Sequence, residues 1–246
     1  MSKVRLLDNL MICENFITQE EAEATLKVLY REAEKDPEFW KGISFYESYS
    51  SGYPMDGDPY LAEVGLPATW FSDLEKRFKE FTAEMAGVSV EDMSKISFHS
   101  QRWLPGAFAP LHSDNSDNEG KLGAFERSRY ATFLYLNDNF DGGELVFPQH
   151  NLTIKPKAGM IAAFHGGHVN LHRVDVVKKA TRYTIGSFWD DRDEEDYPED
   201  LRKAWKAELA EVRAYQKTQQ KDWSDVREKG VRISPDGKEY PAEEVE

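Results

Sequence analysis

Two residues near the middle of the chain have the types and the spacing of metal ligands. His112 and Asp114 are two positions apart, and alternate side chains of a β-strand point to the same face, so both can reach one ion. A nitrogen ligand with a carboxylate oxygen suits iron(II), manganese or zinc. Two histidines and one carboxylate would leave three positions of an octahedron open. The pattern therefore predicts a metal site with room for further ligands.

The third ligand must come from the five other histidines. His99 precedes the pair in an alternating stretch, and His150 lies in a turn. His165 and His168 lie in or beside a Gly-Gly loop, whereas His172 begins an apolar stretch that is typical of a strand. We prefer His172 as the third ligand, with His168, then His165 and His150, as the alternatives.

An arginine that could bind an anion follows at a fixed interval. Arg182 lies ten positions after His172 and begins a stretch typical of a strand. A guanidinium makes a bidentate match to a carboxylate. A cosubstrate that chelates iron through a 2-oxo acid at one end would need such an anchor at its other end. Tyr135 could add a hydroxyl to that carboxylate, and Thr184 lies on the same face as Arg182.

Short strands are the elements that must position these residues. Apolar stretches broken by Gly, Pro and Asn or Asp turns predict strands at 130–136, 144–147, 152–154, 160–164, 172–177 and 181–189. Their spacing favours an antiparallel sandwich or barrel over alternating strands and helices. The polar loop 115–129 follows the first two candidate ligands, where a lid would lie.

Helices are expected on both sides of this strand region. A capping box of Thr18 and Glu21 predicts a helix at 19–35, and apolar residues at steps of three or four predict another at 68–87. Strands are expected at 4–12 and 95–103. Loops with short strand pieces are expected at 41–66, where Phe45, Tyr46, Tyr49 and Tyr53 are candidates to line the mouth of a binding site. An acidic run at 190–196 precedes a predicted helix at 199–222, and a turn at 234–237 could join two short strands.

Composition limits the class of protein and its partners. The chain has 246 residues, a formal net charge of −14 and one cysteine, Cys13. The charge disfavours nucleic acid as a partner, and a single cysteine excludes an intrachain disulfide. No apolar run approaches the roughly 20 residues that span a membrane, and the N-terminus lacks the pattern of a signal peptide. We therefore expect a cytoplasmic protein with no membrane partner, whose oligomeric state stays open.

Further motifs surround the candidate ligands in a fixed order. In sequence they are Trp103 and Gly106, His112 and Asp114, Arg129–Asn137, Gly142-Gly143-Glu144, Phe147-Pro148, Pro156 and Gly159, His172, and Arg182. Residues 103–189 thereby resemble the prolyl 4-hydroxylase-type 2-oxoglutarate/Fe(II) oxygenases, and the start of the chain, 4–35, also resembles the start of that family.

The resemblance implies a fold, a ligand set and cofactors. The implied fold is mainly β with flanking helices (α+β): a double-stranded β-helix, also called a jelly roll and cupin-like, with N-terminal helices packed on it and a C-terminal helix. The resemblance implies iron on His112, Asp114 and His172, and 2-oxoglutarate on Arg182 with Tyr135 as a helper. Thr184 and Trp103 are further candidates for cofactor binding, although Trp103 stands where many members carry Tyr. O2 is the second cosubstrate, and ascorbate is a candidate cofactor.

The resemblance also implies an activity and a division of the chain. The expected reaction is hydroxylation of an unactivated C–H bond, in a prolyl residue of a peptide or protein, with release of succinate and CO2. The alternatives are the same chemistry on a free amino acid or other small molecule, and a cupin-like protein that binds metal or ligand without oxygenase activity. Residues 1–190 are expected to form the oxygenase domain, with its catalytic core at 95–190, and 191–246 a C-terminal helical extension and tail.

Overall fold

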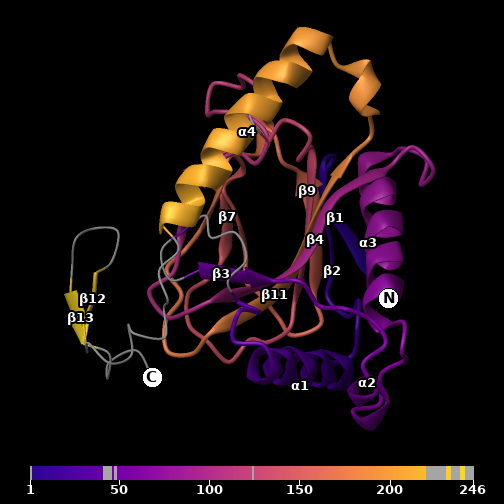
Figure 1. Ribbon diagram of the computed structural model, residues 1–246, viewed down its shortest axis with the longest axis vertical. Coiled ribbons are helices and arrows are strands. Elements are labelled where there is room, and N and C mark those ends of the chain that lie inside the picture. The colour runs from indigo at the N-terminus through magenta and orange to yellow at the C-terminus, as the bar shows by residue number, and fades with distance from the viewer. Residues whose placement is uncertain are drawn as a thin grey trace.

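Two antiparallel sheets form the centre of the computed structural model, which describes residues 2–40, 46, 49–123, 125–219, 231–233 and 239–241. The larger sheet has seven strands in the order β1-β2-β9-β6-β11-β4-β3, and the smaller has four in the order β5-β10-β7-β8 (Figure 1). The larger sheet comprises β1 (Lys3–Leu7), β2 (Leu10–Cys13), β3 (Tyr49–Gly52), β4 (Ser94–Trp103), β6 (Tyr130–Tyr135), β9 (Ile161–His165) and β11 (Arg182–Asp190). The smaller comprises β5 (Ala109–His112), β7 (Leu145–Phe147), β8 (Leu152–Ile154) and β10 (His172–Val174).

Two long helices cover the outer face of the larger sheet. Helix α1 (Gln19–Lys35) begins at the predicted capping box: the Glu21 backbone N–H donates to the Thr18 hydroxyl, and the Thr18 N–H donates to the Glu21 carboxylate. Helix α3 (Trp70–Ala86) buries an apolar stripe and ends at Gly87, whose positive φ of 72° suits the left-handed cap. Buried side chains of both helices share one core with β2, β6, β9 and β11, and Figure 1 shows α3 alongside that sheet.

Helix α4 (Glu199–Gln219) lies on the other side of the molecule from α3 (Figure 1). Trp205 is its buried anchor and contacts Tyr197, with ring centroids 5.1 Å apart, whereas Leu201 is 41% exposed. The helix predicted at 199–222 is confirmed as far as Gln219, and 220–222 lie outside the described residues. Strands β12 (Val231–Ile233) and β13 (Glu239–Pro241) pair, as expected around the turn at 234–237, which is also outside them.

Other elements differ in detail from the sequence-based expectations. The stretch 4–12 is a hairpin of β1 and β2, because Asp8 and Asn9 form a turn. Strand β5 was not predicted, since Pro105, Gly106 and Pro110 obscure its alternation. The region 41–66 contains β3 and the short helix α2 (Tyr60–Glu63). The remaining short 3-10 helices are η1 (Pro148–His150), η2 (His168–Asn170) and η3 (Glu194–Asp196).

The strand predicted at 172–177 is shorter than expected. Strand β10 ends at Val174. Beyond it, backbone N–H groups donate to carbonyls of loop residues instead of to a neighbouring strand. Asp175 N–H donates to the Glu144 carbonyl at 3.0 Å, and Val177 N–H to the Ala107 carbonyl at 2.9 Å.

In the part of the chain that the structure describes, no helix is both long and apolar enough to cross a membrane.

The register of the larger sheet determines which side chains face the smaller one. Strand β11 pairs with β4 on one side and with β6 on the other, so Thr184 lies between Gln101 and Tyr135. Arg182 is opposite Trp103 in the same ladder. Because alternate residues share a face, one row of polar and aromatic side chains from three strands lies between the sheets.

Candidate active site

The smaller sheet brings the three candidate metal ligands together. His112 ends β5, His172 begins β10, and the register pairs them directly, with ring centroids 4.3 Å apart. Asp114 follows β5, and its backbone N–H donates to the Gly166 carbonyl at 2.7 Å. Its Oδ1 lies 3.6 Å from His112 Nε2 and 3.7 Å from His172 Nε2. One possible ligand atom from each residue lies within 4.8 Å of the others.

Backbone carbonyls fix the orientation of both imidazoles. His112 Nδ1 lies 2.7 Å from the Pro110 carbonyl, and His172 Nδ1 lies 3.0 Å from the Asn170 carbonyl. A carbonyl only accepts, so each Nδ1 carries the hydrogen and each Nε2 presents a lone pair. Asp114 Oδ2 is buried and has no hydrogen-bond partner among the described residues. The donor set therefore fits a divalent cation.

The protein environment affects the two imidazoles differently. Burial lowers the pKa of His172 to about 4, so its ring is neutral near pH 7, the form that binds a metal. Burial also lowers the pKa of His112, but the hydrogen bond and charge of Asp114 outweigh it, and the net direction is upward. A bound cation would compete with a proton at His112.

The other histidines lie outside this cluster. His150 Nε2 bonds to the Val169 carbonyl and the Asn170 side chain. His165 Nδ1 accepts the Gly167 N–H at 3.0 Å, within the Gly-Gly loop. Over the described residues, the only group of three or more residues suited to hold a metal is that of His112, Asp114 and His172.

Arg182 is a buried cation that has no ion pair with any of the described residues. Arg182 is only 2% exposed. Its guanidinium carbon lies 5.1 Å from the centre of the Trp103 ring and 5.0 Å from the centre of the Tyr135 ring. Within the described part of the chain, Nε and Nη1 of Arg182 and the Tyr135 hydroxyl have no hydrogen-bond partner. A buried, unpaired charge is costly. These groups could therefore hold the carboxylate of a ligand.

Gln101 connects the other two candidates for cofactor binding. The Thr184 hydroxyl donates to Gln101 Oε1 at 2.7 Å, and the Trp103 indole N–H donates to the same oxygen at 3.4 Å. Gln101 Nε2 lies 3.1 Å from His99 Nε2. Trp103 lines the cavity, whereas Thr184 supports its wall through Gln101. Sequence analysis missed Gln101: its spacing places it on the same strand face as Trp103, but its hydrogen bond to Thr184 is a cross-strand contact that leaves no local signal.

One cavity of about 410 Å³ is lined by the His-Asp-His cluster and by Arg182 and Tyr135. Three of the aromatic residues singled out in the sequence line it, namely Tyr46, Tyr49 and Tyr53, and Phe45 lies outside the described residues. The Tyr46 hydroxyl lies 3.2 Å from His112 Nε2. The opposite wall includes Phe133 and Phe188.

Two glycines allow a tight approach beside Arg182. Gly142 has φ +69°, and a Cβ there would lie 1.9 Å from the Val176 carbonyl oxygen. Gly143 has φ +66°, and a Cβ there would lie 3.0 Å from Arg182 Cδ. Both positions need glycine for conformation and for space. The Gly-Gly-Glu motif thus lets the chain before β7 pass close to Arg182.

Comparison with known proteins agrees with this geometry. Residues 98–190 match the model of the 2OG-Fe(II) oxygenase superfamily. The mouse 2-oxoglutarate and iron-dependent oxygenase domain-containing protein 3 is 43% identical over 128 residues, which cover 47% of this chain and 38% of that protein. Mouse prolyl 3-hydroxylase 2 is 34% identical over 88 residues, 31% of this chain and 12% of that protein. The chain therefore spans well under half the length of these relatives.

Solved structures show the same fold. The viral collagen prolyl hydroxylase of Paramecium Bursaria Chlorella virus-1, solved with 2OG, superposes with a TM-score of 0.54 at 18% identity, covering 74% of this chain and 94% of that one. The predicted double-stranded β-helix is confirmed. The superfamily whose model matches residues 98–190 is named for 2OG and Fe(II). This family uses Fe(II), 2-oxoglutarate and O2, and the His-Asp-His cluster is compatible with iron.

Proposed function

We propose that this protein is a dioxygenase that hydroxylates a prolyl residue of a polypeptide and releases succinate and CO2. One observation supports the proposal most strongly: a metal-compatible cluster and a buried, unpaired arginine share one cavity. A 2-oxo acid that also carries a distal carboxylate complements both. A cupin-like protein without oxygenase activity would not need the second feature.

In this proposal each side chain has a defined role. His112, Asp114 and His172 hold Fe(II), and their backbone hydrogen bonds keep the two rings in the ligating tautomer. Arg182 and Tyr135 bind the distal carboxylate of 2-oxoglutarate through charge-assisted hydrogen bonds. Bound iron, together with 2-oxoglutarate and O2, supplies the oxidising chemistry that inserts oxygen into a C–H bond.

The remaining cavity walls position the groups and exclude water. The Trp103 and Tyr135 rings cover the Arg182 guanidinium, which strengthens its attraction for a carboxylate by lowering the local dielectric. Gln101 accepts hydrogen bonds from Trp103 and Thr184 and so fixes the wall behind the cosubstrate.

The aromatic lining supports a prolyl substrate. Tyr46, Tyr49 and Tyr53 line one side of the cavity and Phe133 and Phe188 another, and the apolar pyrrolidine ring packs well on such faces. Relatives named for prolyl hydroxylation occur among both the sequence and the structure matches. They include a 3-hydroxylase by sequence and a 4-hydroxylase by structure, so the identity of the hydroxylated ring carbon must be determined from the product.

A coupled assay tests the proposal. The protein is incubated with Fe(II), 2-oxoglutarate, ascorbate, O2 and a pool of proline-containing peptides, and both succinate and the peptide masses are measured. We expect succinate to form in proportion to a 16 Da gain on prolyl residues, with the ring carbon assigned by fragmentation and NMR. Succinate that forms only with free amino acids would instead support the small-molecule alternative.

A further inference from the structure

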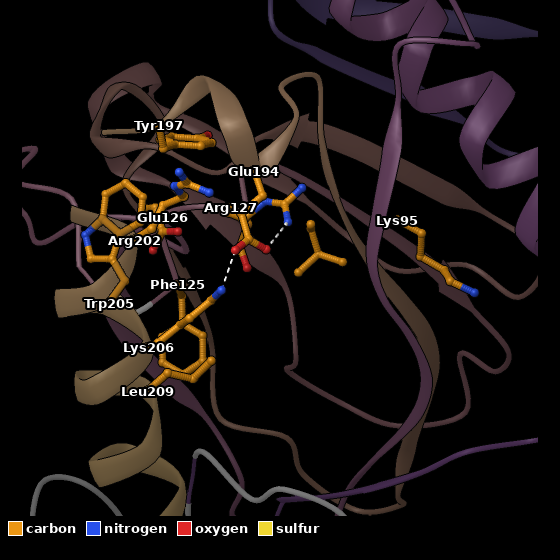
Figure 2. Close-up of a pocket in the computed structure, with 12 residues that line it drawn as sticks. Lys95, Phe125, Glu126, Arg127, Glu194, Tyr197, Arg202, Trp205, Lys206 and Leu209 are labelled. Carbon is orange, nitrogen blue, oxygen red and sulfur yellow. Dashed lines mark hydrogen bonds and ion pairs between the residues drawn. The ribbon is translucent and has the colours of Figure 1, made fainter. Parts of the chain in front are cut away.

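A second cavity of about 290 Å³ lies between α4, the segment 125–128 and the start of β4 (Figure 2). Figure 2 shows Leu209 of α4 beside Phe125, Lys206 extending toward Glu194, and Trp205 on the side of Tyr197. The wall is apolar at Phe125, Trp205 and Leu209, and most of the rest of it is charged. Its remaining members are Lys95, Ile96, Glu126, Arg127, Ser128, Glu194, Tyr197 and Arg202.

This α4 cavity adjoins the cavity of the metal cluster. Ile96, Phe125 and Ser128 line both cavities. The β4–β11 register shifts between Phe188 and Trp189, which leaves Ile96 as an extra residue on β4. Such a bulge re-aims a side chain, and here Ile96 faces the two cavities. These shared residues place the α4 cavity directly beside the cavity that contains the metal cluster.

Two polar groups in the α4 cavity lack partners. Glu126 is 6% exposed, and its Oε2 is buried without a hydrogen-bond partner among the described residues. Nε of Arg202 is likewise buried and unpartnered there. Most other charges of the wall are paired: Glu194 binds both Arg127 and Lys206, as the dashed lines of Figure 2 show, and Lys95 binds Glu75. Among the described residues, Glu126 Oε2 and Arg202 Nε are thus the acceptor and the donor of this wall that are left for a ligand.

An open strand edge runs beside the two cavities. Strand β3 pairs only with residues 100–103 of β4. On that side, residues 94–99 of β4 have no strand partner within the described structure, although β11 pairs with them on the other side. An exposed edge is a template for an added, extended peptide.

We propose that the α4 cavity is a second subsite, which binds the main chain and one large apolar side chain of an extended polypeptide whose reacting residue lies at the metal cluster. A peptide N–H donates to Glu126 Oε2, and a peptide C=O accepts from Arg202 Nε. The apolar side chain packs among Phe125, Trp205 and Leu209. This inference rests on the proposed function and extends it, because a free amino acid would fill one cavity and leave the second unused.

A selection from random peptides tests this subsite. Displayed decapeptides with a fixed central proline are panned on the full chain loaded with Mn(II), which replaces Fe(II) without turnover, and 2-oxoglutarate. We expect enrichment of a large apolar residue at one fixed offset from the proline. The dissociation constant of the best peptide, labelled with fluorescein, is then measured by anisotropy for the wild type and the variants.

The variants separate the subsite from general effects on the fold. Arg202→Met should weaken binding of the selected peptide about 10- to 100-fold, the value of one hydrogen bond to a charged group. Lys203→Met, a matched change of an exposed residue on the same helix, should leave it unchanged. Glu126→Gln retains an acceptor oxygen and should weaken peptide binding only a few-fold. Glu126→Leu removes the acceptor and should weaken peptide binding as much as Arg202→Met. Affinity for 2-oxoglutarate should be the same in all four.

Each other outcome overturns a defined part of the reasoning. Peptides selected for the proline alone, or peptide binding unchanged in Arg202→Met, would refute the second subsite and leave the proposed function intact. If no peptide is enriched although Mn(II) and 2-oxoglutarate bind normally, both the subsite and the polypeptide substrate are wrong. If 2-oxoglutarate itself does not bind, the proposed function is wrong.

Discussion

Replacing Arg182 with methionine should separate ligand binding from stability. Nε and Nη1 of Arg182 are buried without partners among the described residues, and each buried, unsatisfied donor costs about 1–3 kcal/mol. Methionine removes both donors and the charge, and its flexible apolar chain can occupy the space beside Trp103 and Tyr135. The free energy of unfolding of the metal-free variant should therefore not fall, and it should rise by up to about 3 kcal/mol.

The same change should sharply weaken 2-oxoglutarate binding. A bidentate contact makes two hydrogen bonds to a charged group, at about 1.5–3 kcal/mol each. The loss of at least about 3 kcal/mol corresponds to a Kd at least about 100-fold higher. At a 2-oxoglutarate concentration of 100 times the wild-type Kd, the ligand should stabilise the wild type by about 2.7 kcal/mol but the variant by only about 0.4 kcal/mol.

Denaturant unfolding with and without 2-oxoglutarate, in the presence of Mn(II), measures both effects in one experiment. Isothermal titration calorimetry gives Kd directly, and Mn(II) affinity serves as the control because the metal cluster is unchanged. Equal stabilisation of variant and wild type by 2-oxoglutarate would refute the role of Arg182. A variant destabilised by several kcal/mol without ligand would show that the guanidinium is structurally required.

Three further predictions follow from particular residues. Asp114→Ala should bind Fe(II) far more weakly and abolish turnover, and full activity would contradict the ligand assignment. Gly142→Ala should destabilise the protein by about 3 kcal/mol or more, because left-handed strain and overpacking each cost about 1–3 kcal/mol and the new Cβ would lie 1.9 Å from the Val176 carbonyl oxygen. Gly65 has φ +83° and open space around it, so Gly65→Ala should lower the free energy of unfolding only by the cost of the left-handed backbone. If denaturant unfolding shows equal losses of stability for the two variants, the steric argument is refuted. Burial lowers the pKa of His99 to about 4, so between about pH 6.5 and 4 the unfolded state binds the extra proton and stability falls as the pH falls, by up to about 1.4 kcal/mol per unit. His99→Phe should reduce this loss, and an unchanged stability–pH profile would show that His99 is not neutral in the native state.

Much of the fold could be predicted because local signals agree with the final structure. The capping box and apolar stripe located α1 to the residue at both ends, and the spacing of turns indicated an antiparallel double sheet. Strand β5 could not be found in this way, because it is four residues long and contains a proline. Its pairing with β10 is a long-range contact that leaves no local pattern.

The site could be predicted only in part, because motif spacing is visible in the sequence but contacts between distant segments are not. The motif spacing indicated His112, Asp114, His172 and Arg182, and the structure brings these residues into one cavity. Their roles stay predictions until ligands are measured, as does a location in the cytoplasm. Gln101 was missed because its importance depends on cross-strand hydrogen bonds. The α4 cavity was missed because it is formed by segments about 30 to 110 residues apart in sequence.

The central claim is that one cavity holds iron and 2-oxoglutarate together, and an anaerobic titration tests it most directly. Visible absorption of the metal-free protein is recorded as Fe(II) and then 2-oxoglutarate are added. We predict a weak charge-transfer band that needs both additions, is absent in Asp114→Ala and requires far more 2-oxoglutarate in Arg182→Met. Bound iron without any band on addition of 2-oxoglutarate would contradict the account.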